Sequence, residues 1–183
     1  MIWFWSDTHF NHEGIITFCK RPFAGVDEMN EAMIEAWNST VGKSDTIYMV
    51  GDFAFKPLLK GIPLSTLFQR LKGKKHLVVG NHDEKNKENL RLPWTSISWI
   101  AFIKDQKRRV MACHYPMETW RNSHSGSVMV HGHCHGTLKR MIPHRFDVGA
   151  DVWPKPVSFD HLWGIAASQK FESTDGHEER EQG

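Results

Sequence analysis

The sequence predicts an α/β fold in which helices pack on a sheet of mainly parallel strands. Two observations support this. In the first half of the chain a short apolar run ends in polar residues three times, and segments with helical spacing lie between these runs. A length of 183 residues suits a single domain with a substantial core. In α/β folds functional side chains gather at the carboxyl ends of the strands, so we expect one site there.

The first half is expected to contain three strands, over residues 2–6, 46–50 and 76–79. Helices are expected over 13–19, 27–41 and 64–71. The second helix has the clearest pattern, because Met29, Met33 and Trp37 follow helical spacing up to Gly42, with Asp27 as the expected N-cap. These elements alternate as an α/β fold requires.

The second half is expected to contain consecutive strands. A hairpin is predicted from 98–104 and 108–113, then a loop over 117–127, strands over 127–130 and 145–148, and a final helix over 158–168. Residues 171–183 are acidic and poor in apolar side chains. We therefore expect a domain over residues 1–170 followed by a flexible tail over 171–183.

Composition narrows the class of protein. A formal net charge of +2 gives no strong signal for nucleic-acid binding. Three cysteines without a C-x-x-C pair argue against a disulfide framework and favour a reducing compartment. Neither a signal peptide nor a membrane-spanning run is visible, so the sequence predicts a cytoplasmic protein.

The densest functional signal lies between Val130 and Gly136, where three histidines stand at every second position. If this stretch is extended, His131, His133 and His135 point to one side and Cys134 to the other. Neutral imidazole is a common metal ligand, so the stretch favours a metal site over a surface histidine run.

Similar polar blocks end the other strands. In chain order they are Asp7-x-His9, Gly51-Asp52, Gly80-Asn81-His82-Asp83, His114 and Gly132-His133-x-His135. Together, and in this order, they resemble the calcineurin-like metallophosphoesterase family, and they span residues 7 to 135. The resemblance implies a β-sandwich of two mixed sheets flanked by helices, with a dinuclear metal site at the strand ends.

The resemblance also implies a role for each residue of the blocks. Asp7, His9 and His135 would hold the first metal, and Asn81, His114 and His133 the second. Asp52 would bridge the two metals. His82 would contact the phosphate and protonate the departing alkoxide, Asp83 would orient His82, and His131 would support the site from behind.

Two divalent metal ions are the implied cofactors. Nitrogen and oxygen ligands without thiolate suit manganese, which we expect, and also iron, nickel, cobalt or zinc. A hydroxide that bridges the two ions would attack phosphorus.

Substrate contacts are expected from loops beside the blocks, namely from Asn11, His12, Arg21, Trp120 and Arg121. An arginine there could grip a second phosphate and Trp120 could stack on a base, although ordinary packing explains these side chains equally well. We expect hydrolysis of a small phosphodiester or a nucleotide-type phosphoester. The alternatives are a protein phosphatase or nuclease with the same site, and a non-catalytic, metal-binding module that uses the same pocket to bind a partner or a nucleotide.

Overall fold

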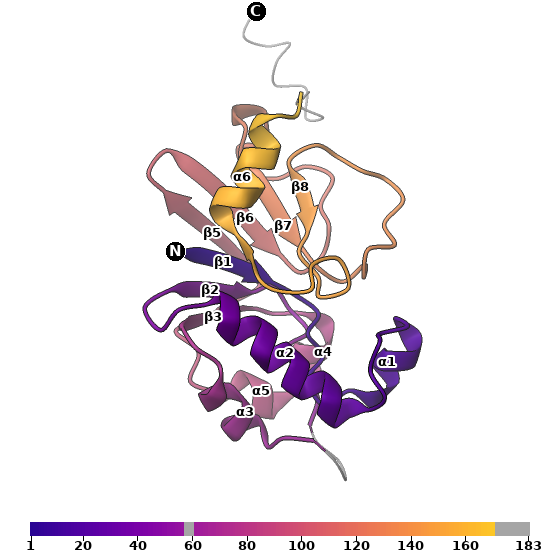
Figure 1. Ribbon diagram of the computed structural model, residues 1–183. Helices are drawn as coiled ribbons and strands as arrows, with labels where there is room; N and C mark the ends of the chain where they lie inside the picture. Colours follow the sequence, from indigo (N-terminus) through magenta and orange to yellow (C-terminus); the bar gives the residue numbers. More distant parts are fainter. Residues whose placement is uncertain (57–60, 171–183) are drawn as a thin grey trace, which may run out of the picture.

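Two β-sheets face each other in the computed structural model, which describes residues 1–56 and 61–170 (Figure 1). The first sheet is built from β1 (Ile2–Trp5), β2 (Thr46–Met49), β3 (Lys74–Val78), β4 (Ser96–Ser98) and β9 (Val157–Ser158), in the order β4-β3-β2-β1-β9. The second is built from β5 (Ile100–Asp105), β6 (Arg108–Cys113), β7 (Val128–His131) and β8 (Arg145–Asp147), in chain order. The expected α/β sandwich of two mixed sheets is confirmed.

Strand direction determines where the polar blocks lie. β1, β2, β3 and β4 run parallel in the first sheet, and only β9 pairs antiparallel. In the second sheet β6, β7 and β8 run parallel, and β5 forms an antiparallel hairpin with β6. Parallel strands present their carboxyl ends at the same edge of a sheet, so the polar residues after each strand can meet.

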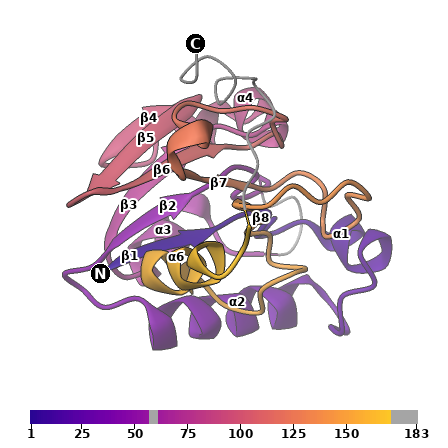
Figure 2. The same ribbon diagram turned by 90° about the horizontal axis from the view of Figure 1, so that it is seen from above.

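The helices cover the first sheet on its outer side. Figure 1 shows α2 (Val26–Thr40), α3 (Leu64–Arg70) and α5 (Lys87–Leu90) on the side of this sheet away from the second sheet. The remaining helices are α1 (Glu13–Phe18), α4 (Asn81–Lys85), α6 (Phe159–Ala167) and the short 3₁₀ turn η1 (Ser123–Ser125). Seen from above, α6 lies beside β1, which it contacts along with β7 and β9 (Figure 2).

The sandwich has an apolar core on each face of the first sheet. In β1, Phe4 packs in the core between the sheets, whereas its neighbour Trp5 packs against Trp37 of α2 on the outer side. Both strand residues are fully buried. Alternate side chains of a strand point to opposite faces, so one short strand serves both cores.

Three local expectations were incomplete or wrong. Gly25 is the N-cap of α2, and Asp27 lies in the first turn, where its charge favours the helix N-terminus. Residues 96–98 form a separate strand that pairs with β3, so the hairpin begins only at Ile100. Neither α5 nor β9 was expected, because segments of four and two residues are too short to show a period. The predicted tail over 171–183 lies outside the described residues.

In the part of the chain that the structure describes, every helix is too short or too polar to cross a bilayer.

Candidate metal centre

Backbone hydrogen bonds draw the ends of the strands together. The Asp7 N–H donates to the Gly51 carbonyl, and the His9 N–H donates to the Asp52 carbonyl, both at 3.0 Å. On the second sheet, the Gly132 N–H donates to the His114 carbonyl at 3.0 Å. The polar blocks therefore form one connected group of loops at the strand ends.

Five of the expected ligands adopt left-handed backbone conformations. The φ angles are 53° at Asp7, 48° at His9, 56° at Asp52, 70° at His133 and 47° at His135. The extended conformation assumed for His133 and His135 is wrong, because β7 ends at His131. Positive φ in a residue other than glycine costs about 1 kcal/mol or more and is enriched at functional sites. These turns, rather than strand alternation, aim the side chains.

The two histidines after β7 point into different groups. The Nδ1 atom of His133 lies 3.1 Å from Asn81 Oδ1, and the His133 ring centroid lies 5.2 Å from that of His114. The ring of His135 instead stacks on His9, with centroids 5.3 Å apart. They lie in the two groups to which the resemblance assigns them.

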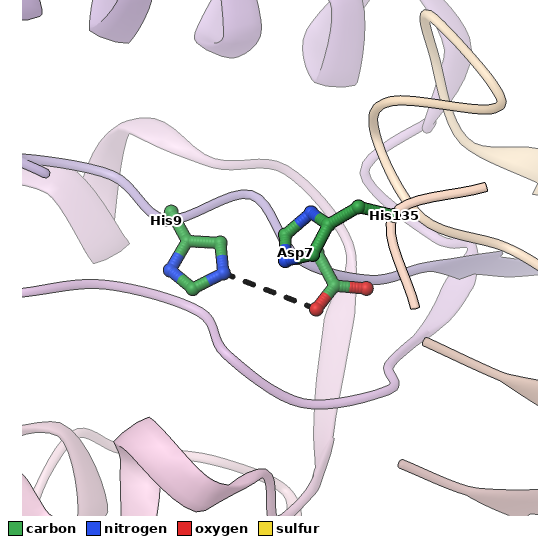
Figure 3. A group of neighbouring side chains, drawn as sticks. All are labelled: Asp7, His9 and His135. Atoms are coloured by element: carbon green, nitrogen blue, oxygen red, sulfur yellow. Dashed lines mark ion pairs between the residues drawn. The ribbon is translucent and has the colours of Figure 1, made fainter. Parts of the chain in front are cut away.

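The first group consists of Asp7, His9 and His135 (Figure 3). One ligand atom of each lies within 4.8 Å of those of the other two, and His9 Nε2 lies 3.9 Å from Asp7 Oδ1. Asp7 and His9 are almost completely buried. The group can therefore surround one cation with a carboxylate and two imidazoles.

The second group lies on the other side of the Asp52 carboxylate. His114 Nε2 lies 3.2 Å from Asn81 Oδ1 and 3.4 Å from Asp52 Oδ2. The same Asp52 oxygen lies 3.7 Å from His9 Nε2 of the first group. This carboxylate thus lies between the two groups of expected ligands.

The side chain of His9 tests whether the residues fit metal ions. It is 1% exposed, and neither ring nitrogen has a hydrogen-bond partner among the described residues. A buried polar atom without a partner is costly, so a missing ligand is indicated. Separations of 3.7 and 3.9 Å from carboxylate oxygens are too long for hydrogen bonds. They suit atoms that each coordinate one cation at about 2 Å. The residues fit divalent metals.

Hydrogen bonds at Nδ1 of His114 and His135 determine which nitrogen of each ring faces the candidate metal centre. His114 Nδ1 lies 2.9 Å from the Val50 carbonyl oxygen, which can only accept, so Nδ1 carries the hydrogen. His135 Nδ1 likewise donates to Asp151 Oδ2 at 2.7 Å. In both rings Nε2 is left for a metal, an arrangement typical of metal-binding histidines.

Burial and neighbouring charges shift the pKa values of the expected ligands in different directions, and burial raises the pKa of Asp7 to about 7. Burial lowers the pKa of His9 to about 2, so this imidazole is neutral. Burial also works against a charged His114, but its hydrogen bond to Asp52 prevails and raises the His114 pKa to about 9. For Asp52 burial is outweighed by His114, and the pKa falls to about 2. A metal at His114 must displace that proton, so metal binding releases protons.

Comparison with known proteins shows the family to which the chain belongs. The sequence pattern described as calcineurin-like phosphoesterase matches residues 1–171. The chain belongs to the calcineurin-like phosphoesterase family. It is accordingly a metal-dependent hydrolase of phosphoesters, and the recognition made from the five blocks is confirmed.

Relatives are found in archaea, phages and bacteria. An uncharacterised protein of Methanocaldococcus jannaschii is 34% identical over 162 residues, covering 85% of each chain. The gene 66 protein of Mycobacterium phage L5 is 27% identical, covering 89% of this chain and 92% of its own. The crystal structure of protein AQ665 from Aquifex aeolicus superimposes with a TM-score of 0.71 at 26% identity, covering 88% of this chain and 97% of that one.

Asp151 is a functional residue that the sequence analysis missed. Besides accepting from His135, its carboxylate accepts from Arg21 Nε and Nη2, both at 2.8 Å. Arg21 in turn donates to the backbone carbonyls of Asp7 at 2.7 Å and Thr8 at 2.9 Å. The pair therefore holds the first metal group from two sides. The sequence does contain a signal for Asp151. Like the other polar blocks, it follows the end of a strand, here β8, which ends at Asp147.

Arg21 is consequently not the substrate contact that was expected. It is 8% exposed, and its guanidinium is occupied by Asp151 and the two carbonyls. Cys19 also lies within 4.8 Å of ligand atoms of His135 and Asp151. The guanidinium charge on that side disfavours a further cation there.

Asp83 also acts differently from the expectation. Its Oδ2 accepts from the backbone N–H groups of Gly80 at 2.9 Å and Asp52 at 2.7 Å. Its Oδ1 accepts from the Phe53 N–H at 3.0 Å and from Asn89 Nδ2 at 2.5 Å. The carboxylate thus fixes the backbone that carries Asp52, instead of orienting the His82 ring. Residue N3 of a helix commonly bonds the N-cap backbone in this way.

His82 itself lies at the edge of the metal site. Its Nε2 is 3.9 Å from Asp52 Oδ2, and its side chain is 39% exposed. The backbone N–H of His82 donates to Asp52 Oδ1 at 2.9 Å. The ring therefore lies beside the Asp52 carboxylate and is also open to solvent.

His131 lies behind the ligands. It is 2% exposed, and its Nδ1–H donates to the Gly132 carbonyl at 2.9 Å. A Cβ atom on Gly132 would lie 1.8 Å from Ser6 Oγ and 2.3 Å from Asp7 Oδ2. Only glycine allows this turn to approach Asp7.

Two further expected substrate contacts have structural roles. Asn11 Nδ2 donates to the carbonyls of Phe55 and Ile62 at 3.2 and 2.9 Å, so its side chain joins two loops. Trp120 is 6% exposed, and its Nε1–H donates to the Ser127 carbonyl at 3.1 Å. A buried ring in such contacts offers no face to a base.

The last two expected contacts lie in different places. The His12 ring stacks on Phe55, with centroids 3.8 Å apart, and lies 6.3 Å from the His82 ring. It therefore borders the site. The Arg121 guanidinium lies 5.0 Å from the ring centroid of Phe102, in a cavity lined by none of the expected metal ligands.

Proposed function

We propose that the protein hydrolyses a phosphodiester or nucleotide-type phosphoester with two divalent cations. Asp7, His9 and His135 would hold one cation and Asn81, His114 and His133 the other, with Asp52 between them. The observation that carries the proposal is the Asp52 oxygen lying between His9 and His114 at 3.7 and 3.4 Å. The bound cations would supply a water activated for attack on phosphorus and would neutralise charge on the phosphoryl oxygens.

The proton for the leaving group would come from His82. As the bond from phosphorus to the leaving oxygen breaks and a bond to the water oxygen forms, the departing oxygen needs one proton. His82 lies beside Asp52 and reaches solvent, so a protonated ring can deliver that proton and regain another from water. The rings of His9 and Phe55, with centroids 5.3 and 4.9 Å from that of His82, limit its movement.

We propose a small soluble substrate and the cytoplasm as the compartment. The near-neutral charge supports a small substrate over a long nucleic acid, which needs a basic groove. All three cysteines are free thiols, which supports a reducing compartment. Manganese is the proposed metal because the ligands are imidazole, carboxylate and amide.

The test combines metal replacement with a change at His82. Protein stripped by a chelator and reloaded with Mn²⁺ is assayed against aryl monoesters, aryl diesters, cyclic nucleotides and phosphopeptides. We expect activity only with metal, and diesters or nucleotides as the preferred substrates. Activity in the metal-free protein would overturn the proposal, and a preference for phosphopeptides would indicate a protein phosphatase.

The variant His82→Gln separates catalysis from metal binding. We expect turnover to fall by about 10²–10⁴-fold, the usual contribution of a general acid, while two metals per chain remain by elemental analysis. The exposed His161 provides a matched control, since His161→Gln changes the same side chain outside the site. Hydrolysis by His82→Gln at the original rate would refute the role of His82.

A further inference from the structure

A groove opens next to the metal site on the side of His82. It has a volume of about 490 Å³ and is lined by Ala54, Phe55, Lys56, His82, Lys85, Asn86, Lys87 and Glu88. No expected metal ligand lines it, and His82 is the residue that it shares with the site. A leaving group beside His82 would therefore lie at the mouth of this groove.

The part of the groove beside His82 is aromatic. The Phe55 ring is half-buried, with one face stacked on His12 at 3.8 Å and 14° and with the tilted His82 ring 4.9 Å away. Asn11 holds the Phe55 backbone through its 3.2 Å bond to the carbonyl. Flat, fixed rings of this kind stabilise a planar aromatic group such as a nucleobase.

Three lysines also line the groove, namely Lys56, Lys85 and Lys87. Lys56 is neutralised by Glu88 at 2.9 Å. Lys85 and Lys87 are exposed and form no ion pair with any described residue. They stand at the end of α4 and the start of α5, two positions apart. Lysine binds phosphate as a point charge, so this wall suits an anion.

We propose that this groove binds the leaving side of the substrate, with a nucleobase against Phe55 and a second phosphate at Lys85 and Lys87. The preferred substrate is then a phosphodiester whose leaving group is a nucleoside carrying a further phosphate. This inference rests on the proposed phosphodiesterase function and adds the class of leaving group. The second phosphate distinguishes it from a simple dinucleoside or aryl diester.

The test compares two matched dinucleotides with the Mn²⁺-loaded protein. One is thymidylyl-thymidine, and the other is the same compound with a phosphate at both ends. We expect the doubly phosphorylated compound to have the higher kcat/KM, by about tenfold. In the double variant Lys85→Ala/Lys87→Ala the ratio of the two kcat/KM values should fall to near one. The double variant Lys43→Ala/Lys107→Ala removes two exposed lysines elsewhere and should keep the original ratio.

The aromatic part of the groove is tested by Phe55→Leu, which keeps an apolar side chain but removes the ring. We expect KM for both dinucleotides to rise by about fivefold or more, with a smaller change for methyl p-nitrophenyl phosphate, whose nitrophenolate is smaller than a nucleoside. An equal change for all three compounds would contradict stacking at this position.

A binding measurement separates the two proposals. Titration of the doubly phosphorylated dinucleotide into metal-free Asp52→Asn protein should give a Kd that weakens about tenfold when Lys85 and Lys87 are both replaced. An unchanged Kd and an unchanged kcat/KM ratio would overturn the groove while metal-dependent hydrolysis still stood. Failure of every diester with intact binding in the groove would instead overturn the proposed function.

Discussion

Replacing Asp151 by asparagine should weaken one metal site and leave the other. In the native protein the carboxylate accepts from His135 at 2.7 Å and from Arg21 twice at 2.8 Å. An asparagine has one oxygen and one amide group, so at least one donor of His135 or Arg21 then faces another donor. Even where the amide oxygen still accepts from His135, the acceptor is neutral instead of charged, so the orientation of His135 is held less firmly. Partners behind metal ligands typically contribute about 10–100-fold in affinity, which corresponds to roughly 1.4–2.8 kcal/mol.

Calorimetric titration of Mn²⁺ into chelator-stripped protein measures this loss. We expect one site to weaken by about tenfold or more and the site that uses His114 and His133 to change little. The control is Asp160→Asn, which removes a carboxylate that is 63% exposed and paired with Arg108. The variant Asp151→Asn also removes the carboxylate that pairs with the buried Arg21, which could unfold the protein. Circular dichroism is therefore needed to show that the variant is folded. Two unchanged affinities in folded Asp151→Asn would refute the orienting role.

Three further predictions concern stability. Gly132→Ala should lower the free energy of unfolding by about 1–3 kcal/mol and weaken Mn²⁺ binding, because the new Cβ lies 1.8 Å from Ser6 Oγ and displaces Asp7; denaturant titration and calorimetry check both. Gly164→Ala should instead stabilise the protein by about 0.5–1 kcal/mol, since this exposed helical position has open space around it; destabilisation would contradict this. For Asp151, burial is outweighed by Arg21 and His135, which lower its pKa, so its stabilisation is present above about pH 4 and lost as the pH falls below that value. The difference in Tm between Asp151→Asn and the unmodified protein should therefore shrink below pH 4, and a constant difference would show that the charge is not responsible.

The placement of the ligands was predictable because it follows from strand direction. Asp52 follows β2, and His114 follows β6. A run of apolar residues that stops at a carboxylate or imidazole marks the carboxyl end of a strand, and parallel strands bring these ends together. The order of the blocks then pointed to the family.

The contacts that hold the ligands were not predictable in the same way. Arg21 and Asp151 are 130 positions apart, and no local period relates them. Asp83 next to His82 indicated a pair of side chains, whereas the helix that begins at Asn81 turns this carboxylate toward backbone N–H groups. The left-handed turn at His133 likewise replaces the alternation of an extended strand. In each case tertiary packing overrides the local pattern.

The division of the ligands between the two sheets links metal supply to folding. Asp7 and Asp52 extend from the first sheet and His114 and His135 from the second, so an unfolded chain does not hold these groups together. A ligand that binds only the native state adds RT ln(1 + [L]/Kd) to its stability, about 2.7 kcal/mol at a hundred times Kd. With the proposed ligands, each cation would hold the two sheets together. The melting temperature should therefore rise with the concentration of free metal.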